Sequence, residues 1–337
     1  SATVNTAAVT AFNGAVGGST QLTSVTTDAP GSTEINGGSV STSGTQTYGD
    51  PATIGANTSI TATTATFDQT LDSAGGTNYT LDITGNAVFE GKVGDTDALG
   101  SLAISGTTAI NGGIVTTTGT QTYTGAVTLG ANAVLESTAD QQIQFKSTID
   151  GAFGLIVNTS GDTRFEGEVG GTNPLTSLTT DAGGTTYISA NITTDGSTQT
   201  YNDAVVLLAN IVFTDLDPAG NITFNSTLDG GFSATVNTAG VTTFNGAVGG
   251  STQLTSLTTD TDGSTEINGG SVSTSGTQTY GDPATIGANT SITATTATFD
   301  QTLDSASGTN YTLDITGNAV FEGTVGDTDA LGSLAIS

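Results

Sequence analysis

The chain of 337 residues repeats itself, and this self-similarity constrains its fold more than any other feature. Residues 1–105 and 233–337 align without gaps at an offset of 232, with seven differences. The differing pairs are Ala8/Gly240, Ala11/Thr243, Val25/Leu257, Ala29/Thr261, Pro30/Asp262, Gly75/Ser307 and Lys92/Thr324. Copies this similar are typical of a tandem array. We therefore predict one continuous repeat structure over residues 1–337, cut from a longer array.

Each long period contains three weaker units of about 77 residues each. Four signatures recur in these sub-repeats: F-x-G-x-V, a leucine-containing strand such as LTSVTTD, T-Q-T-Y, and F-x-x-T-[LI]-D. The signatures make each sub-repeat a variant of one structural unit. We place the sub-repeats at 3–79, 80–155, 156–234 and 235–311, with a partial unit at 312–337.

Composition and alternation both predict β-strands. Thr and Val are abundant and favour strands, whereas good helix formers such as Glu, Lys and Met are scarce or missing. Apolar residues alternate with polar ones, as at Ile143, Phe145 and Ile149, so one side of each strand is predicted to be buried. Steps such as Gly17-Gly18 supply the positive φ angles that sharp corners require. The sequence therefore predicts strands joined by corners and almost no helix.

The spacing of large apolar residues indicates how these strands are arranged. Phe12, Ile35, Tyr48, Phe67 and Phe89 follow one another at steps of 23, 13, 19 and 22, about 19 residues for each anchor. One coil of a β-solenoid takes about that many residues and pairs in parallel with the next coil at about 4.8 Å. We therefore predict an all-β fold, a parallel β-helix (β-solenoid) with about 19 residues per coil. The alternative is a string of tandem β-sandwich domains of about 77 residues, for which a core Trp or Cys pair is missing.

The charge of the chain argues against several partners. It carries 31 acidic and 3 basic residues, a formal net charge of -28. Too few cations are present to neutralise phosphates, so neither nucleic acid nor an anionic membrane surface is expected to bind. No apolar run approaches the roughly 20 residues that cross a bilayer, so no membrane insertion is expected. Many carboxylates and no Cys suit an extracellular or bacterial cell-surface location.

The missing residue types also exclude most catalytic sites. With no His and no Cys, nucleophilic triads, thiol chemistry and the usual zinc sites cannot form. The pairs Glu34 with Asp50, and Asp68 with Asp72, are nominal glycosidase candidates, but such pairs arise by chance among 31 acids. We therefore predict that the chain is not an enzyme and has no catalytic residue.

Calcium is the one cofactor that the sequence suggests, because carboxylates at Gly-rich turns suit a hard cation. The segment G-D-T-D-A-L-G begins at Gly94 and recurs at Gly326. The equivalent turn after Gly17 lacks both acids, and solvated turn carboxylates are the alternative reading. The metal-ligand candidates are Asp95, Asp97, Asp327 and Asp329.

Runs such as TTFNGAVGGSTQLTSLTTD (242–260) and GTQTYTGAVTLGANAVL (119–135) resemble the filamentous haemagglutinin-type β-strand repeat proteins. These are large bacterial surface and secreted polypeptides, and the resemblance extends over the whole chain. It implies a right-handed parallel β-helix that is exported through a dedicated outer-membrane partner. It also implies a role in adhesion, aggregation or matrix formation.

Together these observations predict a structural role, the shaft of an extracellular bacterial fibre or filamentous adhesin. Exposed rows of Thr and Asn are available for lateral contact, and the open ends of a solenoid allow head-to-tail contact. The expected partner is therefore another copy of the chain. The alternative is a multivalent adhesin module that presents many weak glycan- or receptor-binding sites.

Overall fold

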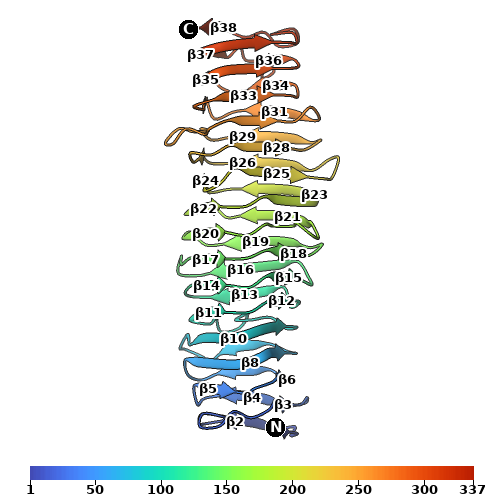
Figure 1. Ribbon diagram of the computed structural model, residues 1–337, viewed down its shortest axis with the longest axis vertical. Coiled ribbons are helices and arrows are strands. Elements are labelled where there is room, and N and C mark those ends of the chain that lie inside the picture. The colour runs from blue at the N-terminus through green and yellow to red at the C-terminus, as the bar shows by residue number, and fades with distance from the viewer. The chain divides into compact units, whose positions relative to one another are not determined.

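The computed structural model describes residues 1–337, and all of its regular elements are β-strands. It contains no helix long and apolar enough to span a bilayer. The chain divides into two compact units, Ser1–Gly167 (unit 1) and Glu168–Ser337 (unit 2), which we describe separately. Figure 1 shows that within each unit the strands of successive coils follow one another in chain order.

Unit 1 contains the first twenty strands. These are β1 (Ala2–Val4), β2 (Val9–Phe12), β3 (Val25–Thr27), β4 (Ser32–Ile35), β5 (Ser39–Ser41), β6 (Gln46–Tyr48), β7 (Ala52–Ile54), β8 (Thr58–Phe67), β9 (Leu71–Ser73), β10 (Thr80–Phe89), β11 (Ser101–Ile104), β12 (Thr108–Ile110), β13 (Ile114–Thr117), β14 (Gln121–Tyr123), β15 (Val127–Leu129), β16 (Ala133–Ser137), β17 (Ile143–Phe145), β18 (Ile149–Asp150), β19 (Gly154–Asn158) and β20 (Asp162–Phe165).

Unit 2 contains the remaining eighteen strands. These are β21 (Leu175–Thr180), β22 (Thr185–Ile188), β23 (Ile192–Tyr201), β24 (Ala204–Leu207), β25 (Ile211–Asp215), β26 (Asn221–Phe224), β27 (Leu228–Asp229), β28 (Ala234–Asn237), β29 (Val241–Phe244), β30 (Leu257–Thr259), β31 (Ser264–Ile267), β32 (Ser271–Ser273), β33 (Thr277–Tyr280), β34 (Ala284–Ile286), β35 (Thr290–Phe299), β36 (Leu303–Ser305), β37 (Thr312–Phe321) and β38 (Ser333–Ile336).

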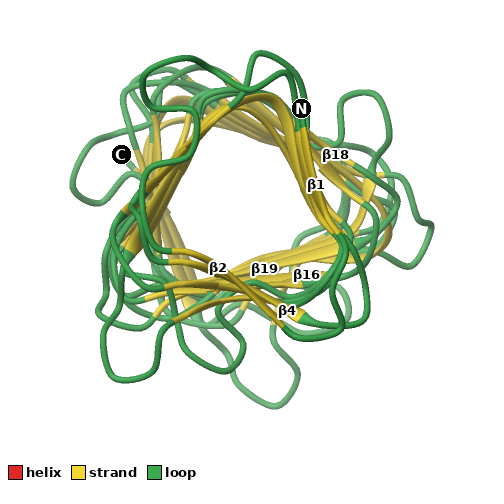
Figure 2. Cartoon of the chain, turned by 90° about the horizontal axis from the view of Figure 1, so that it is seen from below, coloured by secondary structure: helices red, strands yellow, loops and turns green.

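Each coil places its strands on three faces joined by corners (Figure 2). In unit 1 the chain visits faces A, B and C in that order. Face A holds β1, β3, β6, β12, β15 and β18; face B holds β2, β4, β7, β9, β13, β16 and β19; face C holds β5, β11, β14, β17 and β20. The long strands β8 and β10 turn a corner, so their first halves lie on face C and their second halves on face A.

Unit 2 has the same organisation, with faces D, E and F in chain order. Face D holds β25, β28, β30 and β33; face E holds β26, β29, β31, β34 and β36; face F holds β22, β24, β27, β32 and β38. The long strand β23 runs from face D to face E, and β35 and β37 run from face F to face D.

All the pairings between successive coils are parallel, which confirms the predicted β-solenoid. On face A, Val25 lies opposite Gln46, and Gln46 lies opposite Ala65. Registers of this kind place successive coils roughly 21 residues apart. A tandem β-sandwich would instead require antiparallel sheets, so that alternative is wrong. The right-handed winding stays a prediction.

The coil is longer than expected from the anchor spacing because one of the four steps between anchors leads from one face to another. Phe12 and Ile35 lie opposite each other on face B, whereas Tyr48, Phe67 and Phe89 follow one another on face A. The step of 13 from Ile35 to Tyr48 therefore runs around a corner within one coil. The remaining steps of 23, 19 and 22 are true coil lengths.

Aromatic stacks form the centre of the core, because the inward residues of in-register strands lie directly over one another. In unit 1, the Tyr48 and Phe67 rings are 4.8 Å apart on face A, and the Tyr123 and Phe145 rings are 5.1 Å apart on face C. Each stack continues to the Phe of the next coil. The four stacks are Tyr48–Phe67–Phe89, Tyr123–Phe145–Phe165, Tyr201–Phe224–Phe244 and Tyr280–Phe299–Phe321.

Successive stacks occupy different faces, which explains the length of the long period. In unit 1 the stack moves from face A back to face C, and in unit 2 it moves from face E back to face D. A sub-repeat thus corresponds to about three and two-thirds coils, at a coil spacing of roughly 21 residues. Three sub-repeats are needed before a signature returns to its face. Together they make about 11 coils, which matches the offset of 232 between the near-identical copies.

Candidate functional site

Five loops that follow the F-x-G-x-V signature have the same length, and each begins with a glycine of positive φ. A Val before each loop pairs with a neighbouring coil, as does the Leu after the first four, for example Val16 with Val40 and Leu22 with Thr42. The residues between them are largely exposed. Exposed loops on a rigid scaffold are where binding residues concentrate. We call these segments the outer loops: 17–21, 94–98, 170–174, 249–253 and 326–330.

A glycine begins every outer loop because the backbone there is left-handed. Gly94 has a φ of 65°, and a side chain on it would approach the backbone oxygen of Thr116 to 2.1 Å. Gly249 has a φ of 66° and would meet the backbone oxygen of Ser273 at the same distance. Only glycine accommodates both conditions. The V-G step of the signature therefore fixes the exit angle of the loop and leaves the following residues free to vary.

The last residue of the F-x-x-T-[LI]-D signature holds the outer loop of the next coil. Oδ1 of Asp229 accepts hydrogen bonds from the backbone N–H groups of Ser251 at 2.8 Å and Thr252 at 3.0 Å. Asp72 accepts in the same way from Thr96 and Asp97. Bonds of this kind to an ionised carboxylate are stronger than bonds between neutral groups. The signature Asp is therefore a structural residue that orders the loop.

Replacing Asp229 with alanine is expected to destabilise unit 2 by about 1 to 3 kcal/mol, because two loop N–H groups lose a charged acceptor. Amide hydrogen exchange at Ser251 and Thr252 should become faster. Asp229→Asn keeps one acceptor oxygen and should lose less. The exposed Asp195 gives a matched control, since Asp195→Ala should leave exchange in this loop unchanged. Equal exchange in Asp229→Ala and the parent chain would refute the role of Asp229.

The outer loops leave the coil on different faces. In unit 2, Val169 pairs with Ile192 on face D, Val248 pairs with Val272 on face F, and Val325 pairs with Leu303 on face E. The three loops that follow them therefore lie on three faces of that unit. In unit 1, the loops after Val16 and Val93 lie on faces C and B. Figure 2 shows loops that protrude on several sides of the ring of strands.

The four predicted calcium ligands all lie in outer loops. Asp95 is exposed and forms an ion pair with Lys92, at 3.1 Å between Oδ2 and Nζ. The backbone N–H of Asp97 bonds to Asp72, and that of Asp329 bonds to Asp304. Asp327 is exposed at the position equivalent to Asp95. The structure contains no group of three or more acidic side chains arranged to hold a metal ion, and calcium binding stays a prediction.

The nominal carboxylate pairs take part in hydrogen bonds of the fold. Oε2 of Glu34 accepts a bond from the side chain of Asn36, and Asp50 is buried against two threonine hydroxyls. Asp72 holds an outer loop, as described above, while Asp68 is exposed. These contacts give three of the four acids a structural role.

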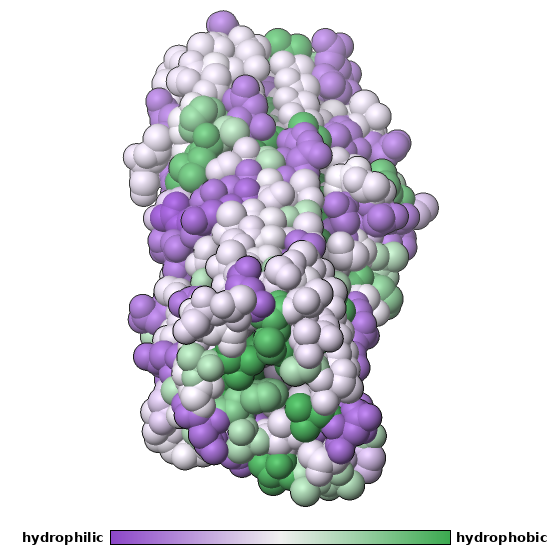
Figure 3. Space-filling view, turned by 60° about the horizontal axis from the view of Figure 1, so that its bottom comes forward, coloured by the Kyte–Doolittle hydropathy of each residue, from purple (hydrophilic) through white to green (hydrophobic).

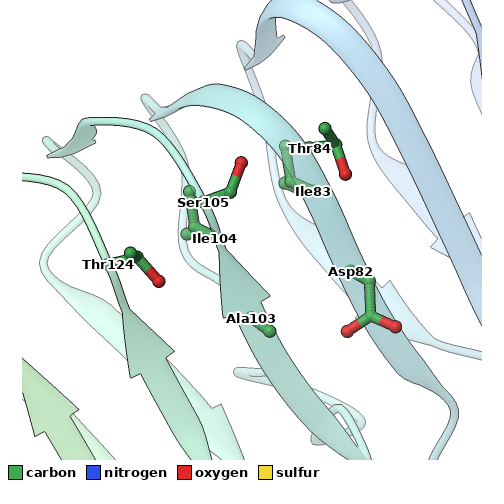
Figure 4. A pocket seen from close by; sticks show the side chains of 7 residues that line it. All are labelled: Asp82, Ile83, Thr84, Ala103, Ile104, Ser105 and Thr124. Carbon is green, nitrogen blue, oxygen red and sulfur yellow. The ribbon is translucent and has the colours of Figure 1, made fainter.

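A shallow depression of about 260 Å³ lies on face C of unit 1, where β10 turns its corner at Gly85. Figure 4 shows the hydroxyl residues Thr84, Ser105 and Thr124 at its rim, with Asp82 on the same strand as Thr84. The lining residues are Asp82, Ile83, Thr84, Ala103, Ile104, Ser105 and Thr124.

A buried Gln–Tyr network explains the T-Q-T-Y signature, which the sequence shows only as a recurring pattern. The Tyr123 hydroxyl donates to Oε1 of Gln121 at 2.8 Å. The Gln121 amide in turn donates to the backbone oxygens of Val115 and Glu136. Both side chains are fully buried, and burial raises the pKa of Tyr123 far above its usual range. The Gln–Tyr pair therefore fixes the register of three strands inside the core.

Comparison of the chain with family models, with curated proteins and with solved structures finds no match. The class of protein is therefore defined by the fold itself, a β-solenoid of tandemly repeated coils. The resemblance to filamentous haemagglutinin-type repeat proteins stays a prediction.

Proposed function

We propose that this chain is part of the shaft of an extracellular bacterial fibre or filamentous adhesin. The observation that carries the proposal is the parallel pairing of successive coils, because each coil presents the same strand edges to the next. An array of near-identical copies therefore extends a solenoid without changing its cross-section. Neutral and hydrophilic residues predominate on the face in Figure 3, which suits a segment surrounded by water.

The length of the particle tests this proposal. One full copy of the long period corresponds to about 11 coils, so each added copy should lengthen the particle by about 53 Å at about 4.8 Å per coil. Chains with one, two and three copies are to be compared by electron microscopy and small-angle scattering. A constant diameter with a linear increase in length is expected. Globular beads on a string would contradict the proposal.

A second function is favoured by the outer loops, which lie on all three faces of unit 2. A repeat that presents loops in several directions gains avidity for a multivalent partner even when each contact is weak. Surface glycans or a receptor are the partners that such a module would bind. Substituting Ser251, Thr252 and Gln253 with glycine, while keeping Val248 and Leu254, removes one loop surface without touching its anchors.

Binding to host cells and to a glycan array separates the two functions. An adhesin module should bind saturably and should lose part of that binding in the loop variant. A scaffold should form fibres and bind neither target in either form. The proposed location is extracellular, and the proposed partner of the shaft is another copy of the chain.

A further inference from the structure

A buried carboxyl group occupies the same corner in three of the four complete sub-repeats. It belongs to the second residue after the T-Q-T-Y signature, at Asp50, Asp203 and Asp282, which are only 1%, 3% and 1% exposed. Each carboxyl accepts hydrogen bonds from two buried threonine hydroxyls of the preceding coil. The bonds are Thr27 2.9 Å and Thr33 2.7 Å to Asp50, Thr180 2.7 Å and Thr186 2.8 Å to Asp203, and Thr259 2.9 Å and Thr265 2.7 Å to Asp282.

The second oxygen of two of these carboxyls has no donor. Oδ2 of Asp50 and Oδ2 of Asp282 are buried and make no hydrogen bond. The surroundings of Asp50 contain further acceptors, since a methyl group built on Gly31 would lie 3.0 Å from Oδ2, 2.7 Å from the Thr6 carbonyl and 2.8 Å from the Ala8 carbonyl. Ionised carboxylates and carbonyls only accept hydrogen bonds. Oδ2 of Asp50 is therefore buried near backbone acceptors and receives no hydrogen bond.

The second sub-repeat shows that the coil forms without this carboxyl. Gly125 takes the position of Asp50, and Ile104 takes the position of Thr27. Thr108, at the position of Thr33, remains buried there and its hydroxyl has no partner. The strands and their registers are the same in both sub-repeats. The buried carboxyl is therefore an addition to the corner and is not required to build it.

The electrostatic surroundings favour the protonated form. Burial raises the pKa of Asp203 and of Asp282 from 3.8 to about 6, against the opposing effect of the threonine hydrogen bonds. Asp181 and Asp260, on the preceding coil, raise these two pKa values further. The other titratable neighbours are Tyr201 and Tyr280, whose pKa values are raised well above the usual range by burial and by the adjacent Asp, and Asp262 beside Asp260.

We propose that the corner carboxyls of Asp203 and Asp282 bind protons on mild acidification and thereby strengthen the coil stack. The sign follows from linkage. An Asp with a folded pKa of about 6 and an unfolded value near 3.8 binds its proton more tightly in the folded state. Stability therefore falls as the pH rises from about 4 through about 6, and acidification from neutral pH restores it. The proposal is independent of the fibre function, because it concerns only the folding equilibrium.

Thermal unfolding between pH 8 and pH 4.5 tests the proposal. The midpoint of the parent chain should rise by several degrees on acidification. The double variant Asp203→Asn, Asp282→Asn should melt higher than the parent at pH 8 and show a weaker dependence on pH. The matched control changes the same number of charges at two exposed positions, Asp195→Asn and Asp300→Asn. It removes general charge repulsion but leaves the corners intact.

The control should keep the steep pH dependence of the parent, whereas equal slopes for the two double variants would overturn the proposal. Carbon-13 NMR of the parent with labelled Asp carboxyls gives a second measurement that does not depend on folding of a variant. Two carboxyl signals that titrate near pH 6 are expected. If all the Asp signals titrate below pH 5, the proposal is wrong.

Discussion

Replacing Phe224 with alanine is expected to destabilise unit 2 by about 3 to 5 kcal/mol, the usual cost of removing a buried aromatic ring. Phe224 is 1% exposed and stacks between Tyr201 at 5.1 Å and Phe244 at 5.4 Å. The edge of Phe213 also packs against it at 5.1 Å. The strands of the two adjacent coils are held in place by the rest of the stack. They therefore cannot move inward to fill the cavity that the missing ring leaves. Urea denaturation followed by circular dichroism measures the loss.

The neighbouring residue Thr223 gives the control for this experiment. It lies on the same strand but faces outward, between Thr200 and Thr243 of the adjacent coils. Thr223→Ala should therefore change the stability by no more than about 0.5 kcal/mol. Similar losses for Thr223→Ala and Phe224→Ala would contradict the assignment of inward and outward residues on face E.

Replacing Gln121 with leucine is expected to cost about 3 kcal/mol, although the two side chains are similar in size, because buried polar groups lose their partners. The variant leaves the Tyr123 hydroxyl without its acceptor and removes the donor to the carbonyls of Val115 and Glu136. Each buried polar group without a partner costs about 1 to 3 kcal/mol. The loss is to be measured by urea denaturation of the full chain.

Two further variants separate the network from general effects of substitution. Gln144→Ala changes a glutamine on the adjacent coil whose amide reaches Glu166 at an exposed position, and it should be nearly neutral. Tyr123→Phe removes the other end of the buried hydrogen bond, so its effect should not add to that of Gln121→Leu. Additive losses in the double variant would show that Gln121 and Tyr123 act independently.

The strands could be predicted well, because the alternation of apolar and polar residues and the turn glycines depend on local sequence alone. The coil length was underestimated because sequence spacing does not show on which face an anchor lies. Ile35 and Tyr48 are both buried, but one belongs to face B and the other to face A. The length of the long period could not be explained from the sequence for the same reason. It depends on the two-thirds of a coil by which each sub-repeat exceeds three whole coils.

The roles of the polar residues were harder to predict because their partners lie one coil away. Asp229 is 22 residues from Ser251, a distance that acquires meaning only once the coil length is known. The burial of Gln46 could have been predicted, since it stands two residues before the inward Tyr48 on a strand. Asp50 follows a corner glycine and carries no comparable signal. Its burial depends on Thr27 and Thr33 of the preceding coil.

The most direct test of the coil stack is the distance between spin labels on Thr26 and Thr128 in unit 1. The chain has no Cys, so Thr26→Cys and Thr128→Cys introduce the only two labelling sites. Both residues face outward on face A, and the registers place five strand spacings between them. Stacked coils predict a narrow distribution centred at about 24 Å, since each spacing is about 4.8 Å. A broad distribution would contradict the β-solenoid. A mean distance far from about 24 Å, as expected if the two labels lay on separate β-sandwich domains, would contradict it as well.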